Sequence, residues 1–538
     1  MKKKLYPIIL TAIFAAILFY IALPAINIQS PGFWIYLFMV LIFYGFIHVV
    51  GILERKSKKM KGQAVQLVMP VSIKFPKWII APVAVFICLI VLSLIYSPIF
   101  LSSKYASRIT INEDGVFAQE VSIVDFNTLP LLDKDSSSKL GDRVMGQMPE
   151  YVSQFQVSDL YTQINYQESV VRVTPLEYNG FFKYWNNKDD GAQGYIKVNS
   201  VTGNTELVKL TEGMKYLDSA YFNENLTRKL RFSYPFYVFG DYSFEIDDDG
   251  SPYWICPVMS YKAIGKLEDV KGVVILDPVT GDSDYYDVGE VPSWVDHVYP
   301  SDLIIEQVDD WGSYQGGFIN SMIGQKNVVN TTDGYNYLAS DGDIYLYTGI
   351  TSAAADESNL GFILTNLRTK ETTFYSCPGA EEYSAMASAE GQVQQMEYTA
   401  SFPLLINLEN RPTYLISLKD NAGLVKMYAF VDVEDYQNVV VSNASDGIVK
   451  AAKNYVGGNF SYETISDDDL IKKTITIASI NQVTIEGTTY FYFTDLEGNK
   501  YKAIITVSQD FLPFMEVGQE VKIGYVEEED VTSINTIQ

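Results

Sequence analysis

A polar stretch at Asp133–Arg143 concentrates carboxylates, hydroxyls and basic groups close to the apolar N-terminal part of the 538-residue sequence. It lacks the periodicity of a helix or a strand. We therefore interpret it as a surface loop, either a binding loop or a solvated loop with internal ion pairs. Lys139 could also activate a neighbouring serine as a Ser/Lys dyad. The candidate binding residues are Asp133, Asp135, Lys139, Asp142 and Arg143.

Patterns for catalysis and metal binding are incomplete. The sequence has two histidines, His48 and His297, which excludes a multi-histidine metal site. The sequence also lacks a phosphate-binding glycine loop. His297 is expected to be a structural residue on a helix. We therefore predict no catalytic residue, no metal and no cofactor.

An acidic run resembles the beginning of a calcium loop. Glu245, Asp247 and Asp249 precede Gly250, but the twelfth position is Cys256 and not the bidentate glutamate that calcium needs. A hairpin tip is the expected structure.

Two of the three cysteines, Cys256 and Cys377, follow the apolar N-terminal part of the chain. Three cysteines are too few for a disulfide-dense scaffold. A disulfide between Cys256 and Cys377 is one interpretation, because the expected compartment permits it. Two small buried hydrophobic side chains are the alternative.

Charge and hydropathy divide the chain near residue 101. Residues 1–101 carry ten Lys/Arg and one acid, a net charge of +9, and the remainder carries 30 Lys/Arg and 64 acids, a net charge of -34. Three uncharged apolar stretches lie in the basic part, at about 5–28, 33–53 and 78–100. Each is long enough to cross a bilayer of about 30 Å as a helix. We therefore predict a membrane anchor of three transmembrane helices.

The basic connectors predict the orientation of this anchor. Lys2, Lys3 and Lys4 precede the first helix, and seven Lys/Arg lie in residues 54–77. The positive-inside rule places both segments in the cytoplasm, so the large C-terminal region is extracellular. The predicted localisation is a multi-pass plasma-membrane protein. The acidity of the outer region excludes nucleic acid as a partner.

Short β-rich runs and a weak internal repeat organise the outer region. Strands are predicted at 243–246, 253–259, 272–277, 344–349, 361–365, 414–418 and 426–431, and helices at 149–164, 215–231, 293–309 and 381–395. The segment Gly194–Gly203 matches Gly272–Gly281, Gly361–Lys370 is a looser copy, and Met427–Asp432 is a degenerate fourth. Each copy is a strand that ends in Asn or Asp, followed by a turn and a second strand. The acidic or amide side chain is expected to bond the turn backbone, with glycine in the left-handed position.

The segment at 274–281, Val-Ile-Leu-Asp-Pro-Val-Thr-Gly, resembles the PepSY-type domain, in which a strand ends in Val-Asp-x-x-Thr-Gly. Such modules pack a helix on a small antiparallel sheet, and the resemblance implies that they restrain peptidases or bind envelope partners. The whole layout resembles a family of membrane-anchored envelope proteins of Gram-positive bacteria that has no established activity. The last strands, at 474–483, 488–495, 500–507 and 521–526, resemble a small oligonucleotide/oligosaccharide-binding (OB) barrel.

These inferences give four parts: an anchor at 1–101, a juxtamembrane segment at 102–147, tandem α+β modules at 148–458 and a small β-barrel at 470–538. We predict a non-enzymatic binding or scaffold protein that holds an envelope protein, such as a peptidase or a wall-synthesis factor, at the bilayer. The alternative is a cell-wall-acting or proteolytic enzyme with carboxylate catalysis, whose acids would include Glu177, Asp189 and Asp190. The oligomeric state is not predicted.

Overall fold

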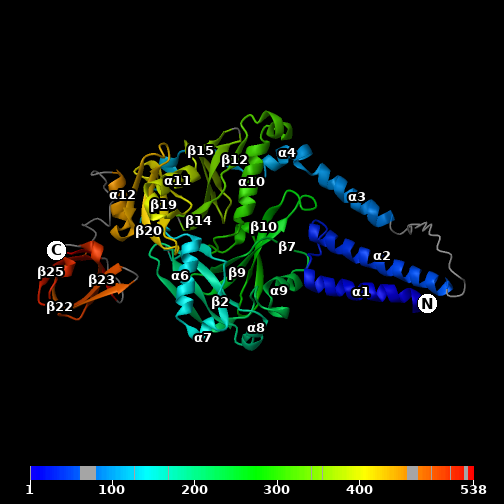
Figure 1. The fold of residues 1–538 in the computed structure, drawn as a ribbon, viewed down its shortest axis with the longest axis horizontal. Helices are drawn as coiled ribbons and strands as arrows, with labels where there is room; N and C mark the ends of the chain where they lie inside the picture. Colours follow the sequence, from blue (N-terminus) through cyan, green and yellow to red (C-terminus); the bar gives the residue numbers. More distant parts are fainter. Residues whose placement is uncertain are drawn as a thin grey trace. The chain divides into compact units, whose positions relative to one another are not determined.

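The computed structural model describes residues 2–60, 80–126, 128–167, 169–340, 342–353, 355–456, 471–485, 488–508, 511–525 and 531–537. The chain forms two compact units. Unit 1 comprises Met1–Ala385, Phe402–Thr413 and Val433–Asp435, and unit 2 comprises Met386–Ser401, Tyr414–Asp432 and Tyr436–Gln538. Figure 1 labels the elements along the chain.

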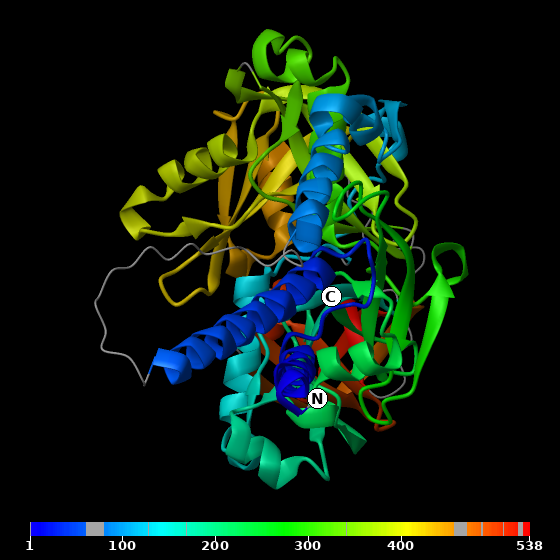
Figure 2. The same ribbon diagram turned by 90° about the vertical axis from the view of Figure 1, so that its right-hand side faces the viewer.

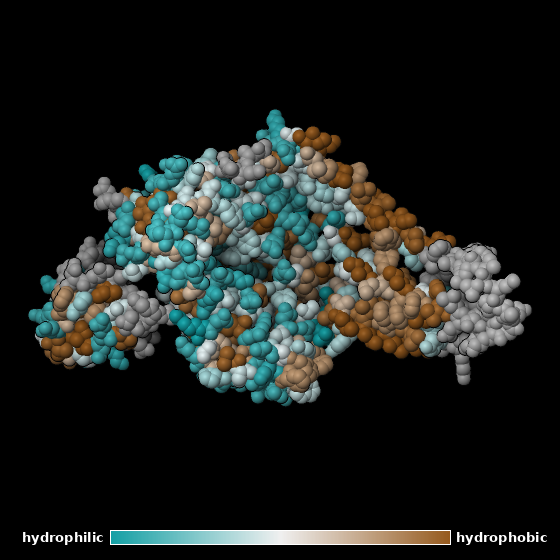
Figure 3. Space-filling view, in the orientation of Figure 1, coloured by the Kyte–Doolittle hydropathy of each residue, from teal (hydrophilic) through white to brown (hydrophobic). Residues whose placement is uncertain are grey.

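Apolar helices begin unit 1. They are α1 (Lys2–Ala22), α2 (Pro31–Met60), α3 (Ile80–Ile95) and α4 (Pro98–Ala106). Among the residues that the structure describes, one helix, α2, is long and apolar enough to cross a membrane, over Pro31–Val50. A second span is possible if α3 and α4, which meet at a 50° bend, are counted together. The exposed surfaces of these helices are hydrophobic (Figure 3). Residues 61–79, which hold part of the predicted basic connector, lie outside the described residues.

Three antiparallel modules with the same strand order form the body of unit 1. In each module, the first two strands both pair with the third strand. The third, fourth and fifth strands then form an antiparallel meander. The first module contains β2 (Phe155–Val157), β3 (Thr162–Tyr166), β4 (Ser169–Tyr178), β5 (Ala192–Asn199) and β6 (Thr205–Met214). The second contains β7 (Val238–Phe239), β8 (Ser243–Ile246), β9 (Pro252–Ser260), β10 (Asp269–Leu276) and β11 (Ser283–Asp287). The third contains β12 (Val329–Thr331), β13 (Asn336–Ser340), β14 (Asp343–Ser352), β15 (Ala355–Asn366) and β16 (Thr372–Ala380), and β1 (Ile111–Gly115) joins its edge parallel to β16.

A helix precedes each of these modules. The helices are α6 (Lys134–Gly146) with α7 (Pro149–Val152), then α9 (Leu226–Ser233), then α10 (Ser301–Tyr314). The prediction of tandem units of helix and antiparallel strands is therefore confirmed at this coarse level. Figure 2 shows the same arrangement from the side on which the apolar helices lie.

The repeated turn has the predicted geometry in three copies. The Oδ1 atom of Asn199 accepts from the Thr202 N–H at 2.8 Å, that of Asp277 from Val279 at 2.7 Å, and that of Asn366 from Arg368 at 2.9 Å. The left-handed position is filled by Gly203 and Gly281, each at φ 78°, and by Lys370 at φ 67° in the third copy.

The helix predictions were less accurate than the strand predictions. Of 149–164, only α7 is helical, because the β-branched residues that follow pair as β2 and β3 with β4. Of the helix predicted at 215–231, only the C-terminal part is α-helical, as part of α9. The helix at 293–309 begins only at Ser301, because Pro300 disfavours a helical residue before it. The fourth is confirmed as α11 (Glu382–Gln392).

The second sheet has a hydrophobic core on each face. Trp254, Cys256 and Val258 of β9 pack with the first module, whereas Ile255 and Met259 pack with the third. This alternation follows from the two-residue period of a strand. The three modules are thus joined by continuous cores, which makes unit 1 a single packed body.

Unit 2 contains a fourth sheet and a barrel. The sheet has the order β17-β19-β20-β21, over β17 (Thr399–Ala400), β19 (Arg411–Lys419), β20 (Val425–Asp432) and β21 (Val439–Asn443), with α12 (Ile448–Val456) following. The five last strands close into a barrel in the order β22-β23-β24-β26-β25. They are β22 (Ile471–Ile485), β23 (Thr488–Asp495), β24 (Lys500–Ile504), β25 (Glu520–Tyr525) and β26 (Thr532–Ile537).

Candidate functional site

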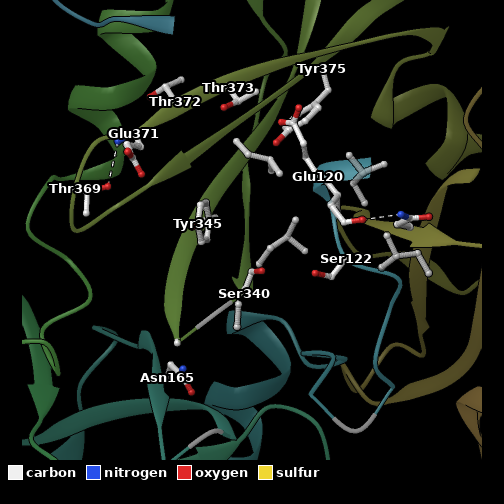
Figure 4. Close-up of a pocket in the computed structure, with 18 of the residues that line it drawn as sticks. Glu120, Ser122, Asn165, Ser340, Tyr345, Thr369, Glu371, Thr372, Thr373 and Tyr375 are labelled. Atoms are coloured by element: carbon white, nitrogen blue, oxygen red, sulfur yellow. Dashed lines mark hydrogen bonds between the residues drawn. The ribbon is translucent and has the colours of Figure 1, made fainter. Parts of the chain in front are cut away.

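The candidate site is a groove on the sheet of the third module. Its cavity volume is about 1300 Å³, and it lies wholly within unit 1. One wall is the face of β13–β16 and β1, and the opposite wall is formed by residues 120–125 and 128–130, with β18 (Leu404–Leu408) beside them. In Figure 4, Tyr345 lies in the middle, with Glu120 and Ser122 on one side and Thr369 and Glu371 on the other.

The segment that forms the second wall is fixed at its start and in its middle. It begins with α5 (Phe117–Glu120), where Phe117 is buried with its ring 6.0 Å from that of Tyr375. The buried Asn407 of β18 holds its middle, because its backbone oxygen accepts from the Val124 N–H at 2.9 Å and its side-chain amide donates to the Val121 carbonyl at 2.6 Å. The groove is therefore preformed by backbone and amide hydrogen bonds.

The floor of the groove mixes hydroxyl, aromatic and aliphatic side chains. Strand register places Tyr345 opposite Leu338, and Thr373 lies between Leu364 and Asn112 on its two neighbouring strands. Such a surface can stack on or bond to an extended polar chain, because aromatic, aliphatic and hydroxyl side chains lie beside one another across the strands. Further polar lining residues are Thr110, Ser122, Thr128, Asn165, Ser340, Thr369, Thr372 and Tyr375.

The electrostatic character of the groove is acidic. Its basic lining residues, Arg108 and Lys370, pair with acids: Arg108 Nη1 lies 2.7 Å from Glu306 and 2.5 Å from Asp310, and Lys370 Nζ lies 2.8 Å from Asp269. The side chains of Arg108 and Lys370 are only 5% and 12% exposed. Their charges are therefore neutralised by partners and shielded from a ligand.

Exposed carboxylates complete this electrostatic pattern. Glu120 and Glu371 line the groove and are exposed to solvent. Burial, and then the Glu120 carboxylate, raise the pKa of Tyr375 to about 12, so the phenol keeps its proton and remains a hydrogen-bond donor. The arrangement favours a neutral or basic ligand that can accept hydrogen bonds from hydroxyls.

The predicted binding loop is a helix, and it lies outside the groove. Asp133 is the N-cap of α6, accepting from the Ser136 N–H at 2.9 Å. Lys139, Asp142 and Arg143 lie on this helix, whereas Ser136 and Ser137 are buried and the Ser137 hydroxyl donates to the Asp133 carbonyl at 2.8 Å. The cap and the tertiary packing of Leu140 and Met145 outweigh the polar composition. Binding by Asp135 and the other residues of this set stays a prediction.

The acids of the enzyme alternative lie elsewhere on the surface. Glu177 accepts from the Ser158 hydroxyl at 2.6 Å in the first module, and Asp189 pairs with Lys188 at 2.7 Å. Neither these residues nor Asp190 line the groove. Among the described residues, no cluster of three or more metal-binding side chains is found.

Glu245 and Asp296 form a buried carboxylate pair that the sequence did not indicate. Glu245 accepts from the backbone N–H groups of Asp296 at 2.8 Å and His297 at 3.1 Å, and Asp296 accepts from Asn165 at 2.7 Å. Burial, and then the charge of Glu245, raise the pKa of Asp296. The pair joins β8, β3 and the loop before α10, so its role is to connect modules.

Two further sequence predictions concern His297 and the acidic run at 245–249. His297 lies in a loop and not on a helix, and its Nε2 atom is 2.7 Å from the backbone carbonyl oxygen of Gln163. The acidic run at 245–249 is a hairpin tip as expected, where Asp247 Oδ1 accepts from Asp249 and Ser251.

The disulfide between Cys256 and Cys377 that was one interpretation of the sequence is not formed. Cys256 is a buried reduced thiol in β9 of the second module, and Cys377 is buried in β16 of the third. The two residues belong to different sheets, which explains why the sulfurs are not joined. Small buried hydrophobic side chains are the better interpretation.

Comparisons with known proteins add little. No protein-family model and no curated protein matches the sequence. Among solved structures, the monoclinic crystal form of an ACO/RPE65 chimera aligns at a TM-score of 0.13 and 9% identity, covering 52% of this chain and 47% of that one. A similarity at that score carries no argument about fold or function.

Proposed function

We propose that the chain is a membrane-anchored extracytoplasmic binding or scaffold protein of the bacterial cell envelope. In this proposal α1, α2 and α3 with α4 are three transmembrane spans, and the body lies outside the cell. The observation that carries it is that the turn between α1 and α2 is hydrogen-bonded into the same packed body that contains the groove. A groove attached in this way is held at a set distance from the bilayer.

The contacts between the turn and the body are specific. The buried Arg231 guanidinium donates to the Leu23 carbonyl at 2.9 Å, and the Ile26 N–H donates to the Pro235 carbonyl at 2.7 Å. On the other side of the turn, the Gln29 amide donates to the Tyr261 carbonyl at 2.8 Å. The turn therefore belongs to the body's side of the helices, which supports an anchor whose N-terminus and basic connector face the cytoplasm.

The three apolar segments also contact one another. The rings of Phe14 and Phe43 stack at 4.0 Å between α1 and α2, and Phe38 of α2 meets Phe86 of α3 at 5.4 Å. The packing of α1 on α2 and the ring contact of α2 with α3 support three spans, although α1 is apolar over only Tyr6–Ala22. Thinning of the bilayer or snorkelling of the N-terminal lysines would accommodate the short helix.

The modules and the barrel each give partial support to the proposed PepSY-like and OB-like folds. The helix before each sheet and the turns at Asn199 and Asp277 support PepSY-like modules. In the barrel, the long β22 pairs with both β23 and β25, and β24 runs parallel to β26, which supports an OB-like fold.

The groove is the proposed site for the partner. An extended segment of an envelope protein, neutral or basic in charge, would fit its hydroxyl-rich floor and its exposed acids. Anchoring the groove raises the effective concentration of that partner at the membrane.

Photocrosslinking in intact cells tests this function. A photoreactive phenylalanine analogue at Tyr345 should yield one reproducible adduct with an envelope protein. The control is the same analogue at Tyr285, a partly buried tyrosine of β11 that does not line the groove. Equal adducts at both positions would refute binding through the groove. Turnover of wall fragments by the full-length protein in detergent would refute a purely binding role and favour the enzyme alternative.

A further inference from the structure

Two exposed hydrophobic patches lie where the apolar helices meet the body of unit 1. The α8 patch lies on and beside α8 (Phe181–Asn187) and α9, and the α4 patch lies on α4 and the turn that follows α10. The α8 patch consists of Phe181, Phe182, Trp185, Phe222, Phe232 and Phe236. The α4 patch consists of Ile99, Phe100, Ile319, Met322 and Ile323. Figure 3 shows hydrophobic surface over both places, on the side from which α1, α2 and α3 extend.

These side chains are unusually exposed for their types. Phe182 is 78% exposed and Trp185 is 54% exposed, while Ile319 and Ile323 are 75% and 82% exposed. Large hydrophobic patches on a water-soluble surface mark sites that contact a partner or a membrane. By contrast, Tyr184 of the same short helix is buried, so α8 is fixed by one tyrosine while its neighbours point outward.

The α8 patch is continuous with the first apolar helix. The ring of Phe232 lies 6.2 Å from that of Phe19 and 6.5 Å from that of Tyr20, near the end of α1. The guanidinium of Arg228 lies 4.3 Å above the Tyr20 ring. Tyrosine and arginine are among the side chains that anchor a helix end at the level of the lipid headgroups.

The α4 patch includes the end of the proposed third span, because Ile99 and Phe100 lie in α4 itself. Tyr105 of α4 contacts Tyr314 at the end of α10, with ring centroids 6.1 Å apart. Ile319, Met322 and Ile323 lie in or next to a single turn of π-helix (Asn320–Gly324), and Gly317 at φ 85° turns the chain toward it. This short projection has no hydrophobic core of its own to explain its composition.

We propose that both patches insert into the outer interface of the lipid bilayer, so that the body rests on the membrane at two points. The inference rests on the proposed anchoring, because it takes the apolar helices as the membrane-spanning part. Two contacts on either side of the helices would prevent the body from tilting. They would therefore set the direction in which the groove opens.

Depth-dependent fluorescence quenching tests this contact. The full-length protein, with Cys88→Ala, carries an environment-sensitive probe at Phe182→Cys or at Ile323→Cys and is reconstituted in phosphatidylcholine/phosphatidylglycerol vesicles. Cys256 and Cys377 are buried and should not take the probe. Asp142→Cys on α6 is the control, since it is exposed and α6 lies on the opposite side of unit 1 from α1 (Figure 1).

Both patch probes should shift to shorter wavelength and lose fluorescence with lipids that carry a nitroxide near the headgroup, whereas the control probe should do neither. Patch probes that behave like the control would overturn the inference. A blue shift without lipid quenching would also overturn it, because it would mean that a protein covers the patches. Alkaline carbonate extraction of the same vesicles separates the two proposals: release of the protein contradicts the anchor itself, whereas retention with unquenched probes contradicts only the patch contact.

Discussion

Glu382 provides a quantitative test of the packing around the third module. It is the first residue of α11, its side chain is fully buried, and a methyl group added to Gly349 would lie 2.6 Å from its Oε1 atom. Burial raises the pKa of Glu382 from the usual 4.5 to about 7, because the carboxylate loses its hydration and neither of its oxygens has a full hydrogen-bond partner among the described residues.

The direction of the pH dependence follows from this raised pKa. The unfolded chain releases the Glu382 proton near pH 4.5 and the folded chain near pH 7, so folding binds a proton between these values. The contribution of Glu382 to the free energy of unfolding is therefore greatest below pH 4.5 and falls as the pH rises to 7, by about 3 kcal/mol. Glu382→Gln, which cannot ionise, should be about 3 kcal/mol more stable than the parent at pH 8, with little difference at pH 4.

Denaturant unfolding of the full-length protein in detergent, followed by intrinsic fluorescence from pH 4 to pH 8, measures this difference. The control is Glu212→Gln on β6, an exposed glutamate whose replacement should give no pH-dependent difference. A stability difference for Glu382→Gln that stays constant with pH, or that has the opposite sign at pH 8, would refute the reasoning.

Three further predictions concern the anchor contact, the repeated turn and the thiols. Arg231→Met should speed hydrogen exchange at the backbone amides of the α1–α2 turn by about tenfold or more, because the turn loses a hydrogen bond from a charged donor. Unchanged exchange would mean that the structure of the turn does not depend on Arg231. Gly281→Ala should cost about 1–3 kcal/mol on unfolding, given its positive φ and a Cβ that would lie 2.4 Å from a tyrosine ring, whereas Gly289→Ala, with open space around it, should cost almost nothing. Cys256 and Cys377 should resist alkylation in the folded protein, and each should take one label after unfolding without reductant. If neither takes a label after unfolding, the two cysteines form a disulfide.

The sequence predicted local features well where a residue's own chemistry determines the backbone. The turns at Asn199 and Asp277 formed because a short polar side chain can bond the next backbone amides and a glycine can adopt positive φ. The strands at β8 and β9 were predicted from their β-branched and aromatic residues. The helix at 134–146 was missed because its polar composition hid the Asp133 cap and the apolar face around Leu140.

The groove could not be predicted, because it is built from residues far apart in the sequence. Asn407 holds a segment near Val121, and β1 pairs with β16, which follows it by more than 250 residues, as the pairing of Ile111 with Thr372 shows. Each of these residues looks ordinary in its own segment. Likewise, nothing in the sequence near Glu245 or Asp296 indicates that tertiary packing would bury two carboxylates together.

The central claim is that the groove-bearing body lies outside the cell on a membrane anchor, and cysteine accessibility in intact bacteria tests it most directly. In a Cys88→Ala background, a membrane-impermeant maleimide is applied to cells that carry either Asp282→Cys, in the exposed turn between β10 and β11, or Ser57→Cys, in the basic connector. The account predicts labelling of the first in intact cells and of the second only after permeabilisation. Labelling of Ser57→Cys but not Asp282→Cys in intact cells would contradict the orientation and, with it, the proposed role.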